Sequence, residues 1–156
     1  MDNKYVKPHS LLRMFGALLA IIVFISMFIG AQVTGFSGTI NFSFPSAFFG
    51  GDYCKGNLVA FFGYLFVLIA GLAGLAFVFI DEIIGKDLTK KLSYVAGGLA
   101  ILASIFILLF APIFRSVNGW KADYVHTTAA PIVFGILGLC VGALEIAAPI
   151  LEKKGQ

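Results

Sequence analysis

Long uncharged runs constrain this 156-residue chain more than any other feature of its sequence. The runs without Asp, Glu, Lys or Arg cover 14–51, 56–80, 92–114 and 124–144. A helix needs about 20 apolar residues to cross the hydrocarbon core of a bilayer, where an open strand would leave backbone groups unsatisfied. We therefore predict an all-α fold, a single four-helix membrane domain over 1–156. Its expected spans lie near 12–33, 57–80, 92–114 and 129–151.

The composition supports a membrane protein and excludes the main soluble classes. Hydrophobic residues make up 60% of the chain and charged residues 12%, whereas soluble domains carry about 25% charged residues. An ordinary soluble enzyme, a disordered protein and a soluble nucleic-acid-binding protein are therefore excluded, and the lipid bilayer is the first expected partner. The first apolar run is longer than the stretch of about 7–15 residues typical of a signal peptide, so we expect it to remain as a helix.

The basic residues predict how the helices are oriented. Most of them fall in the N-terminal segment, in the C-terminal tail and in the middle loop, 81–91, which we interpret as a hairpin turn. These are Lys4, Lys7, Arg13, Lys86, Lys90, Lys91, Lys153 and Lys154. The two outer loops, 34–56 and 115–126, hold Lys55, Arg115 and Lys121. Because Lys and Arg concentrate in cytoplasmic segments, both termini are predicted to be cytoplasmic.

The first outer loop, 34–56, is aromatic rather than hydrophilic. Alternation of Ile40, Phe42 and Phe44 with polar residues predicts a short strand. We expect this loop to pack over the bundle or to lie in the lipid interface; the alternative is contact with a partner protein or an opposing membrane. The candidate contact residues in the two outer loops are Phe42, Phe44, Phe48, Phe49 and Trp120.

Two residues of the first outer loop are candidates for covalent modification. Asn41 begins an Asn-Phe-Ser sequon, which is an acceptor site for N-glycosylation in secreted segments. Cys54 is a candidate for a disulfide between two subunits, or it stays reduced. The second cysteine, Cys140, falls in the middle of the fourth predicted span, so the two cysteines are expected at different depths and should not pair.

Small residues recur at helical spacing in the later spans. Gly71 and Gly74 fall in the second predicted span, and Gly138 and Gly142 form a GxxxG pair in the fourth. Lipid tails are as apolar as Leu, so membrane helices associate through close packing at such residues. We expect these glycines to pack the helices of one bundle together; contact between subunits is the alternative.

Glu145 is the one acidic residue inside a predicted span, on the same helix face as Gly138 and Gly142. Ionisable residues inside a membrane span are rare and often mark a functional site, so Glu145 is a candidate site residue. Pro149, four residues later, has no N–H, so the carbonyl of Glu145 loses its helical donor. Three interpretations stay open: an ion pair with Arg13, a site for an ion or proton, and a protonated, hydrogen-bonded acid.

Patterns typical of catalysis or of cofactor binding do not occur in the sequence. The two histidines, His9 and His126, are predicted on opposite sides of the membrane, and no spacing typical of metal ligands occurs. No glycine-rich phosphate loop follows a strand, and no Ser or Cys has a His and an acid on its own side at a spacing that suits catalysis. We therefore expect no enzymatic activity, no cofactor and no metal.

The outline of four short-looped spans with both ends inside resembles the MARVEL-type tetraspan proteins, which include the synaptogyrin and synaptophysin group. The resemblance rests on a basic approach to the first span at 8–13, a cysteine-containing outer loop that leads into the second span at 52–60, and Asp81, which closes that span. The chain departs from the group because its first outer loop holds one cysteine, Cys54, where paired cysteines are usual. The resemblance implies a role in organising vesicles or membrane domains, without catalysis.

The sequence thus predicts a non-enzymatic tetraspan scaffold, or an accessory subunit that packs with other membrane proteins or with itself. The small-residue faces, the lack of a polar pathway and the aromatic outer loop favour this function. The alternative is an oligomeric channel for ions or protons, or a carrier of small solutes, with Glu145 at its site.

Overall fold

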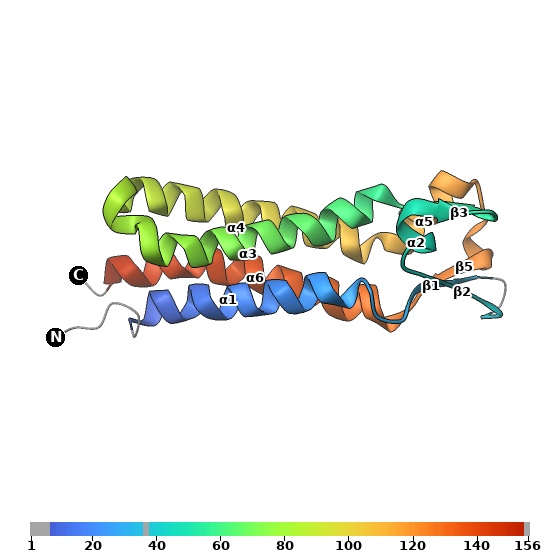
Figure 1. Cartoon of the computed structure of the whole chain (residues 1–156), viewed down its shortest axis with the longest axis horizontal. Coiled ribbons are helices and arrows are strands. Elements are labelled where there is room, and N and C mark those ends of the chain that lie inside the picture. The colour runs from blue at the N-terminus through green and yellow to red at the C-terminus, as the bar shows by residue number, and fades with distance from the viewer. Residues whose placement is uncertain (1–6, 36–37, 155–156) are drawn as a thin grey trace.

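The computed structural model describes residues 7–35 and 38–154. Four long helices run antiparallel as a bundle, with the first and last described residues at one end and a cap of strands and short helices at the other (Figure 1). The bundle helices are α1 (Pro8–Ser26), α3 (Leu58–Ile84), α4 (Lys86–Leu108) and α6 (Ala129–Lys154). Each helix packs against two neighbours in the order α1, α3, α4, α6, and α3 also touches α6 across the centre. We call the two ends the termini end and the cap end.

All four bundle helices are long and apolar enough to cross a membrane, which confirms the predicted four-helix architecture at that level. The 19 residues of α1 and the 23 residues of α4 correspond to about 28 and about 34 Å along the helix axis. These lengths match a hydrocarbon core of roughly 30 Å.

Glycines end two of the helices at places that differ from the predicted spans. α1 ends at Ser26 and not near 33, because the chain turns at Gly30, which has a φ of 70°, and then enters a strand. The loop predicted at 81–91 is almost wholly helical: α3 continues to Ile84, and α4 starts at Lys86. Gly85 makes this turn with a φ of 85°, a backbone conformation that glycine adopts at little cost.

The third predicted span is divided into two helices. α4 ends at Leu108, and α5 (Phe110–Asn118) follows after a break at Leu109. Pro112 explains the break, because proline has no N–H and its ring clashes with the carbonyl four residues earlier. The segment predicted as the start of the second outer loop therefore belongs to a helix that packs in the cap.

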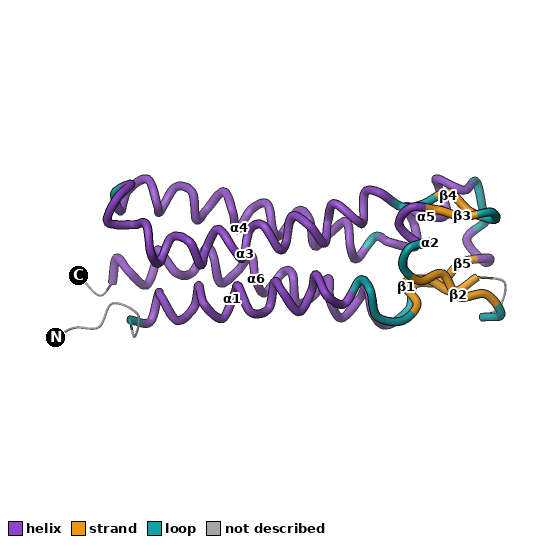
Figure 2. The backbone as a smooth tube through the Cα atoms, in the orientation of Figure 1, coloured by secondary structure: helices purple, strands orange, loops and turns teal. Residues whose placement is uncertain are grey.

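A three-stranded antiparallel sheet joins the two outer loops in the cap (Figure 2). β1 (Ala31–Gly35) is the central strand, β2 (Ile40–Ser43) pairs on one side of it, and β5 (Val125–Thr127) pairs on the other. Val33 has a partner in both neighbouring strands. The short elements between these strands and the bundle helices are α2 (Ser46–Phe49), β3 (Gly50–Gly51), β4 (Cys54–Lys55) and the 3-10 turn η2 (Ala122–Tyr124). The all-α class therefore describes the bundle and not the cap.

Aromatic side chains fill the interior of the cap. The ring centroid of Phe42 lies 5.2 Å from that of Phe114 and 5.8 Å from that of Trp120. The ring of Phe48 lies 5.2 Å from that of Phe110. Because these residues come from both outer loops and from α5, the rings hold the loops against each other over the end of the bundle.

Candidate functional site

Arg13 of α1 and Glu145 of α6 lie inside the bundle near its termini end. The exposed fraction is 1% for Arg13 and 0% for Glu145, and α1 packs directly against α6. Glu145 lies about 14 Å along the helix axis from the end of α6 at Lys154. The acid therefore points into the bundle, as its position on the glycine face of the helix indicates.

Two glycines make room for the carboxylate of Glu145. A methyl group built on Gly74 of α3 would overlap both carboxylate oxygens and the carbon that joins them. A methyl group built on Gly16 of α1 would lie 3.4 Å from Oε1. The carboxylate thus occupies the volume that a side chain at residue 74 would take.

Gly71 has a different role, in the contact between α1 and α3. A methyl group there would overlap the Cβ of Ala20 and would lie 3.2 Å from the carbonyl oxygen of Gly16. The close approach of these two helices therefore requires a glycine at residue 71, and it brings the backbone of α1 within reach of the acid.

Ser93 of α4 completes the site from the fourth helix. Its hydroxyl donates to the main-chain carbonyl of Glu145 at 3.1 Å and lies 3.4 Å from Oε2. This carbonyl has no helical donor because Pro149 stands four residues later. The serine therefore supplies the hydrogen bond that the proline removes. The sequence predicted the unpaired carbonyl but not its partner, since the reach of Ser93 to α6 depends on how the helices pack.

Arg13 and Glu145 are neighbours, but some of their polar atoms remain without hydrogen bonds. Nε and Nη2 of Arg13 and Oε1 of Glu145 are buried and have no partner in the described part of the chain. The central carbon of the guanidinium lies 5.8 Å from the ring centroid of Phe77 in α3, within the range of a cation–π contact. Arg13 and Glu145 reach this interior from α1 and α6, which pack directly against each other.

A second buried polar cluster, which the sequence did not reveal, lies at the cap end. The hydroxyl of Tyr64 donates to Oε1 of Gln32 at 3.1 Å. The amide of Gln32 donates to the carbonyls of Ser26 at 3.5 Å and of Met27 at 3.4 Å. The last carbonyls of a helix lack intrahelical donors, so this amide caps the end of α1. Gln32 is a lone amide at the end of the first predicted span, 12–33, and that position was the available signal.

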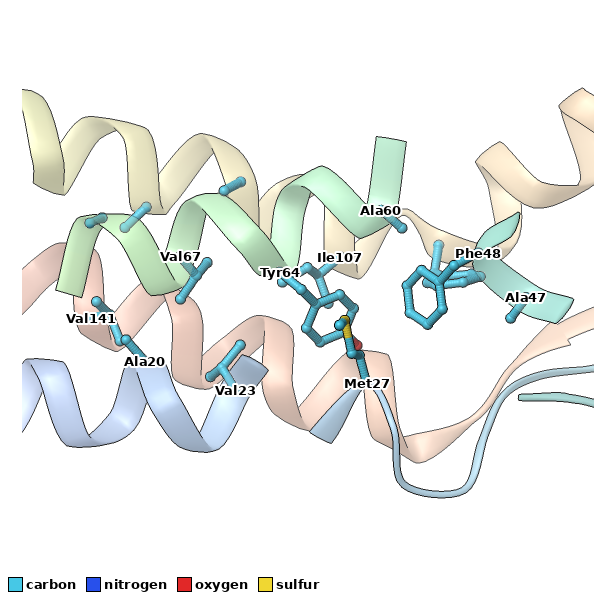
Figure 3. Packing of buried hydrophobic residues seen from close by; sticks show 14 of the residues in the cluster. Ala20, Val23, Met27, Ala47, Phe48, Ala60, Tyr64, Val67, Ile107 and Val141 are labelled. Atoms are coloured by element: carbon cyan, nitrogen blue, oxygen red, sulfur yellow. The ribbon is translucent and has the colours of Figure 1, made fainter. Parts of the chain in front are cut away.

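Apolar side chains separate the two polar clusters. Ala20, Val23, Val67 and Val141 have exposed fractions of 0% and lie between the helices of the bundle (Figure 3). Ser104 is a buried polar residue at this level, and its hydroxyl donates to a carbonyl one turn earlier in α4 at 2.6 Å. Within the described part of the chain, this apolar layer interrupts a polar path along the bundle axis.

Gly138 and Gly142 face α4 of the same chain. A methyl group on Gly142 would lie 2.8 Å from the carbonyl oxygen of Gly97, and one on Gly138 would overlap the hydroxyl of Ser104. The close approach that the GxxxG pair permits is therefore used inside the bundle, between α4 and α6.

The five candidate contact residues of the outer loops differ in exposure. Phe42 is 5% exposed and Phe48 is fully buried, so these two are corrected from outward contacts to parts of the cap interior. Phe44 and Trp120 are half-buried. Phe49 is 51% exposed and remains accessible to a partner or to lipid. The aromatic pattern did not distinguish these cases, because burial in the cap depends on the second outer loop.

The remaining candidates are spread over the molecule. Cys54 is half-buried in β4, its thiol donates to the carbonyl of Ser46 at 3.6 Å, and burial raises the pKa of this thiol. Cys140 is exposed on α6, and Asn41 is exposed on β2. Among the described residues no group of three or more His, Cys, Asp or Glu side chains is placed to hold a metal ion.

No protein-family model matches the chain, and comparisons with curated proteins and with solved structures found no match.

Proposed function

We propose that the chain is a multi-pass integral membrane protein with both termini in the cytoplasm, and that it acts without catalysis as a tetraspan scaffold or as an accessory subunit of a membrane complex. Four helices of membrane-spanning length support the topology. The excess of basic residues in the segments at the termini end supports the orientation. The role agrees with the resemblance to MARVEL-type tetraspan proteins.

The closed interior of the bundle is the observation that carries this proposal. Ala20, Val23, Val67 and Val141 fill the space between the two polar clusters, and the glycine contacts leave little room between the helix backbones. A solute that crosses through a single bundle would have to separate these helices. We therefore assign the function to the surface of the protein, which contacts lipid and other proteins.

That surface is apolar along the bundle and extends onto the cap. Large hydrophobic residues are exposed on all four long helices. On the cap, Tyr53 is 89% exposed, Phe49 51% and Ile40 45%. We expect lipid to cover the helices and a partner protein, or a second copy, to contact the cap.

The direct test is the mass of the gently solubilised protein in lipid nanodiscs, with and without reductant. A complex of defined stoichiometry, with another membrane protein or with itself, supports the proposal. Reductant sensitivity that disappears in Cys54→Ser and persists in Cys140→Ser would identify the predicted intermolecular disulfide. A monomer that binds nothing and conducts protons or ions across liposomes would refute the scaffold.

The contact surface is tested by a matched pair of substitutions. Phe49→Ala removes an exposed ring from the cap, and Ile83→Ala removes an exposed side chain, 82% accessible, at the opposite end of α3. If the cap is the contact, the first substitution weakens the complex and the second leaves it unchanged. Equal effects would place the contact elsewhere.

Ion or proton handling at Glu145 is the second candidate function, favoured by the buried polar atoms of Arg13 and Glu145 that lack hydrogen bonds. Glu145→Gln, compared with Glu82→Gln at an exposed position near the termini end, separates the two functions. A scaffold assembles less stably when Glu145 is changed, whereas a transporter keeps its assembly and loses flux. If assembly and flux are both unchanged, neither function depends on this residue.

A further inference from the structure

The unpaired polar atoms of Arg13 and Glu145 share one buried region of the bundle. Nε and Nη2 form one edge of the guanidinium, the edge that donates two parallel hydrogen bonds in bidentate contacts, and neither atom has a partner in the described residues. Oε1 of Glu145 is likewise unpaired and lies beside the backbone of α1 at Gly16. A buried polar group without a hydrogen bond destabilises the fold, so the site favours a ligand that supplies the hydrogen bonds.

The charges of the site decide which ligand it accepts. Arg13 repels a cation and Glu145 repels an anion, so a charged ligand gains from one residue and loses to the other. The ligand must accept hydrogen bonds from the guanidinium and donate one to the carboxylate oxygen. A neutral molecule that does both, and that fits among four packed helices, is water, which occupies buried sites with two to four polar partners.

The surroundings of the site are polar on one side only. Toward the termini end lie Ser10 and Thr89, both buried, and His9, which is half-buried. Toward the cap end lies the apolar layer that begins with Ala20 and Val141. A small ligand would therefore exchange with solvent through the termini end.

We propose that the space between Arg13 and Glu145 is a binding site for water, which accepts from the guanidinium edge, donates to Oε1 and exchanges with solvent at the termini end alone. The ion pair is then bridged by water and not direct. The bundle offers a hydrated acid that opens to one side of the membrane and stops at the apolar layer. This inference does not depend on the scaffold role, because it concerns the interior of the folded bundle.

The sequence makes the test specific, because Arg13 and Arg115 are its two arginines. The experiment uses the full chain in liposomes, with arginine and glutamine labelled by nitrogen-15. It measures transfer of magnetisation from mobile water to each arginine Nε and to the side-chain amide of Gln32 by solid-state NMR. Arg115, whose guanidinium donates to Ala122 and Val125 carbonyls at the surface of the cap, is the hydrated reference. The buried amide of Gln32, which donates to main-chain carbonyls, is the dry reference, and Arg115→Lys assigns the arginine signals.

We expect Nε of Arg13 to receive magnetisation at a rate close to that of Arg115 and several-fold faster than the amide of Gln32. A paramagnetic chelate confined to the termini side is expected to suppress the transfer to Arg13 and to spare Arg115, and a chelate on the cap side is expected to do the reverse. Transfer to Arg13 as slow as that to Gln32, together with a direct dipolar coupling between its guanidinium and the carboxylate of Glu145, would overturn the water site. Suppression of Arg13 by the cap-side chelate would overturn the one-sided opening.

Discussion

Gly74→Ala places a methyl group in the volume that the carboxylate of Glu145 occupies. The carboxylate ends a flexible side chain, so it moves more readily than the helix backbone. Displacement removes the 3.4 Å contact between Ser93 and Oε2 and leaves a further buried oxygen without a partner, which costs about 1–3 kcal/mol. Replacing glycine with alanine inside a helix stabilises the helix by up to about 1 kcal/mol, which offsets part of this cost.

Gly98→Ala is the matched control for this substitution. Gly98 lies in a bundle helix as Gly74 does, but a methyl group built on it meets nothing within 4 Å. The control therefore carries the gain in helix propensity without the overlap. We expect Gly74→Ala to be less stable than Gly98→Ala by about 1–3 kcal/mol, measured as the free energy of unfolding in bicelles by steric trapping.

A double-mutant background shows whether the destabilisation by Gly74→Ala depends on the carboxylate of Glu145. In Arg13→Met/Glu145→Ala both charges are gone, and removing both members of a buried pair is less damaging than removing one. The cost of Gly74→Ala should disappear in this background, because the group that the methyl displaces is absent. Equal stability of Gly74→Ala and Gly98→Ala, or an equal cost of Gly74→Ala in both backgrounds, would refute the placement of the acid against Gly74.

Three further substitutions test the packing and the buried hydrogen bonds, each by the free energy of unfolding. Ser93→Ala leaves a buried carbonyl unpaired and should cost about 1–3 kcal/mol. The cost should shrink in a Pro149→Ala background, because residue 149 then regains the N–H that donates to this carbonyl. An undiminished cost would contradict the assignment of this hydrogen bond. Gly97→Ala pushes a methyl group to 2.9 Å from a backbone oxygen of α6 and should cost about 1–3 kcal/mol, whereas its neighbour Gly98→Ala should cost nothing. Tyr64→Phe removes the donor to a buried amide oxygen and should cost about 1 kcal/mol; unchanged stability would show that this hydrogen bond does not hold the end of α1.

The resemblance to MARVEL-type tetraspan proteins and the proposed scaffold role rest on different observations. The resemblance concerns the outline of the sequence, and its weakest point is the single Cys54 in the first outer loop. The scaffold role rests on the closed interior of the bundle. An assembly without reductant sensitivity would therefore leave the scaffold in place and remove the predicted role of Cys54.

The sequence by itself determined the membrane-type architecture. Charged residues are so expensive in hydrocarbon that uncharged runs of span length mark helices directly. α3 and α6 lie close to their predicted spans, whereas α4 starts earlier, at Lys86, and ends at Leu108. The burial of Glu145 also followed from local sequence, because a helix with a 3.6-residue repeat places residues 138, 142 and 145 on one face.

Only the tertiary structure decided which residues of different helices and loops contact each other. Local sequence does not show that Ser93 reaches the carbonyl freed by Pro149, or that Gly74 leaves the volume for an acid on another helix. The sheet in the cap needs three residues of the second outer loop, Val125–Thr127, whose strand is too short to show a period. Contacts of this kind depend on which helix faces meet. They join residues that are far apart in the chain, and the local sequence around each residue does not indicate its partner.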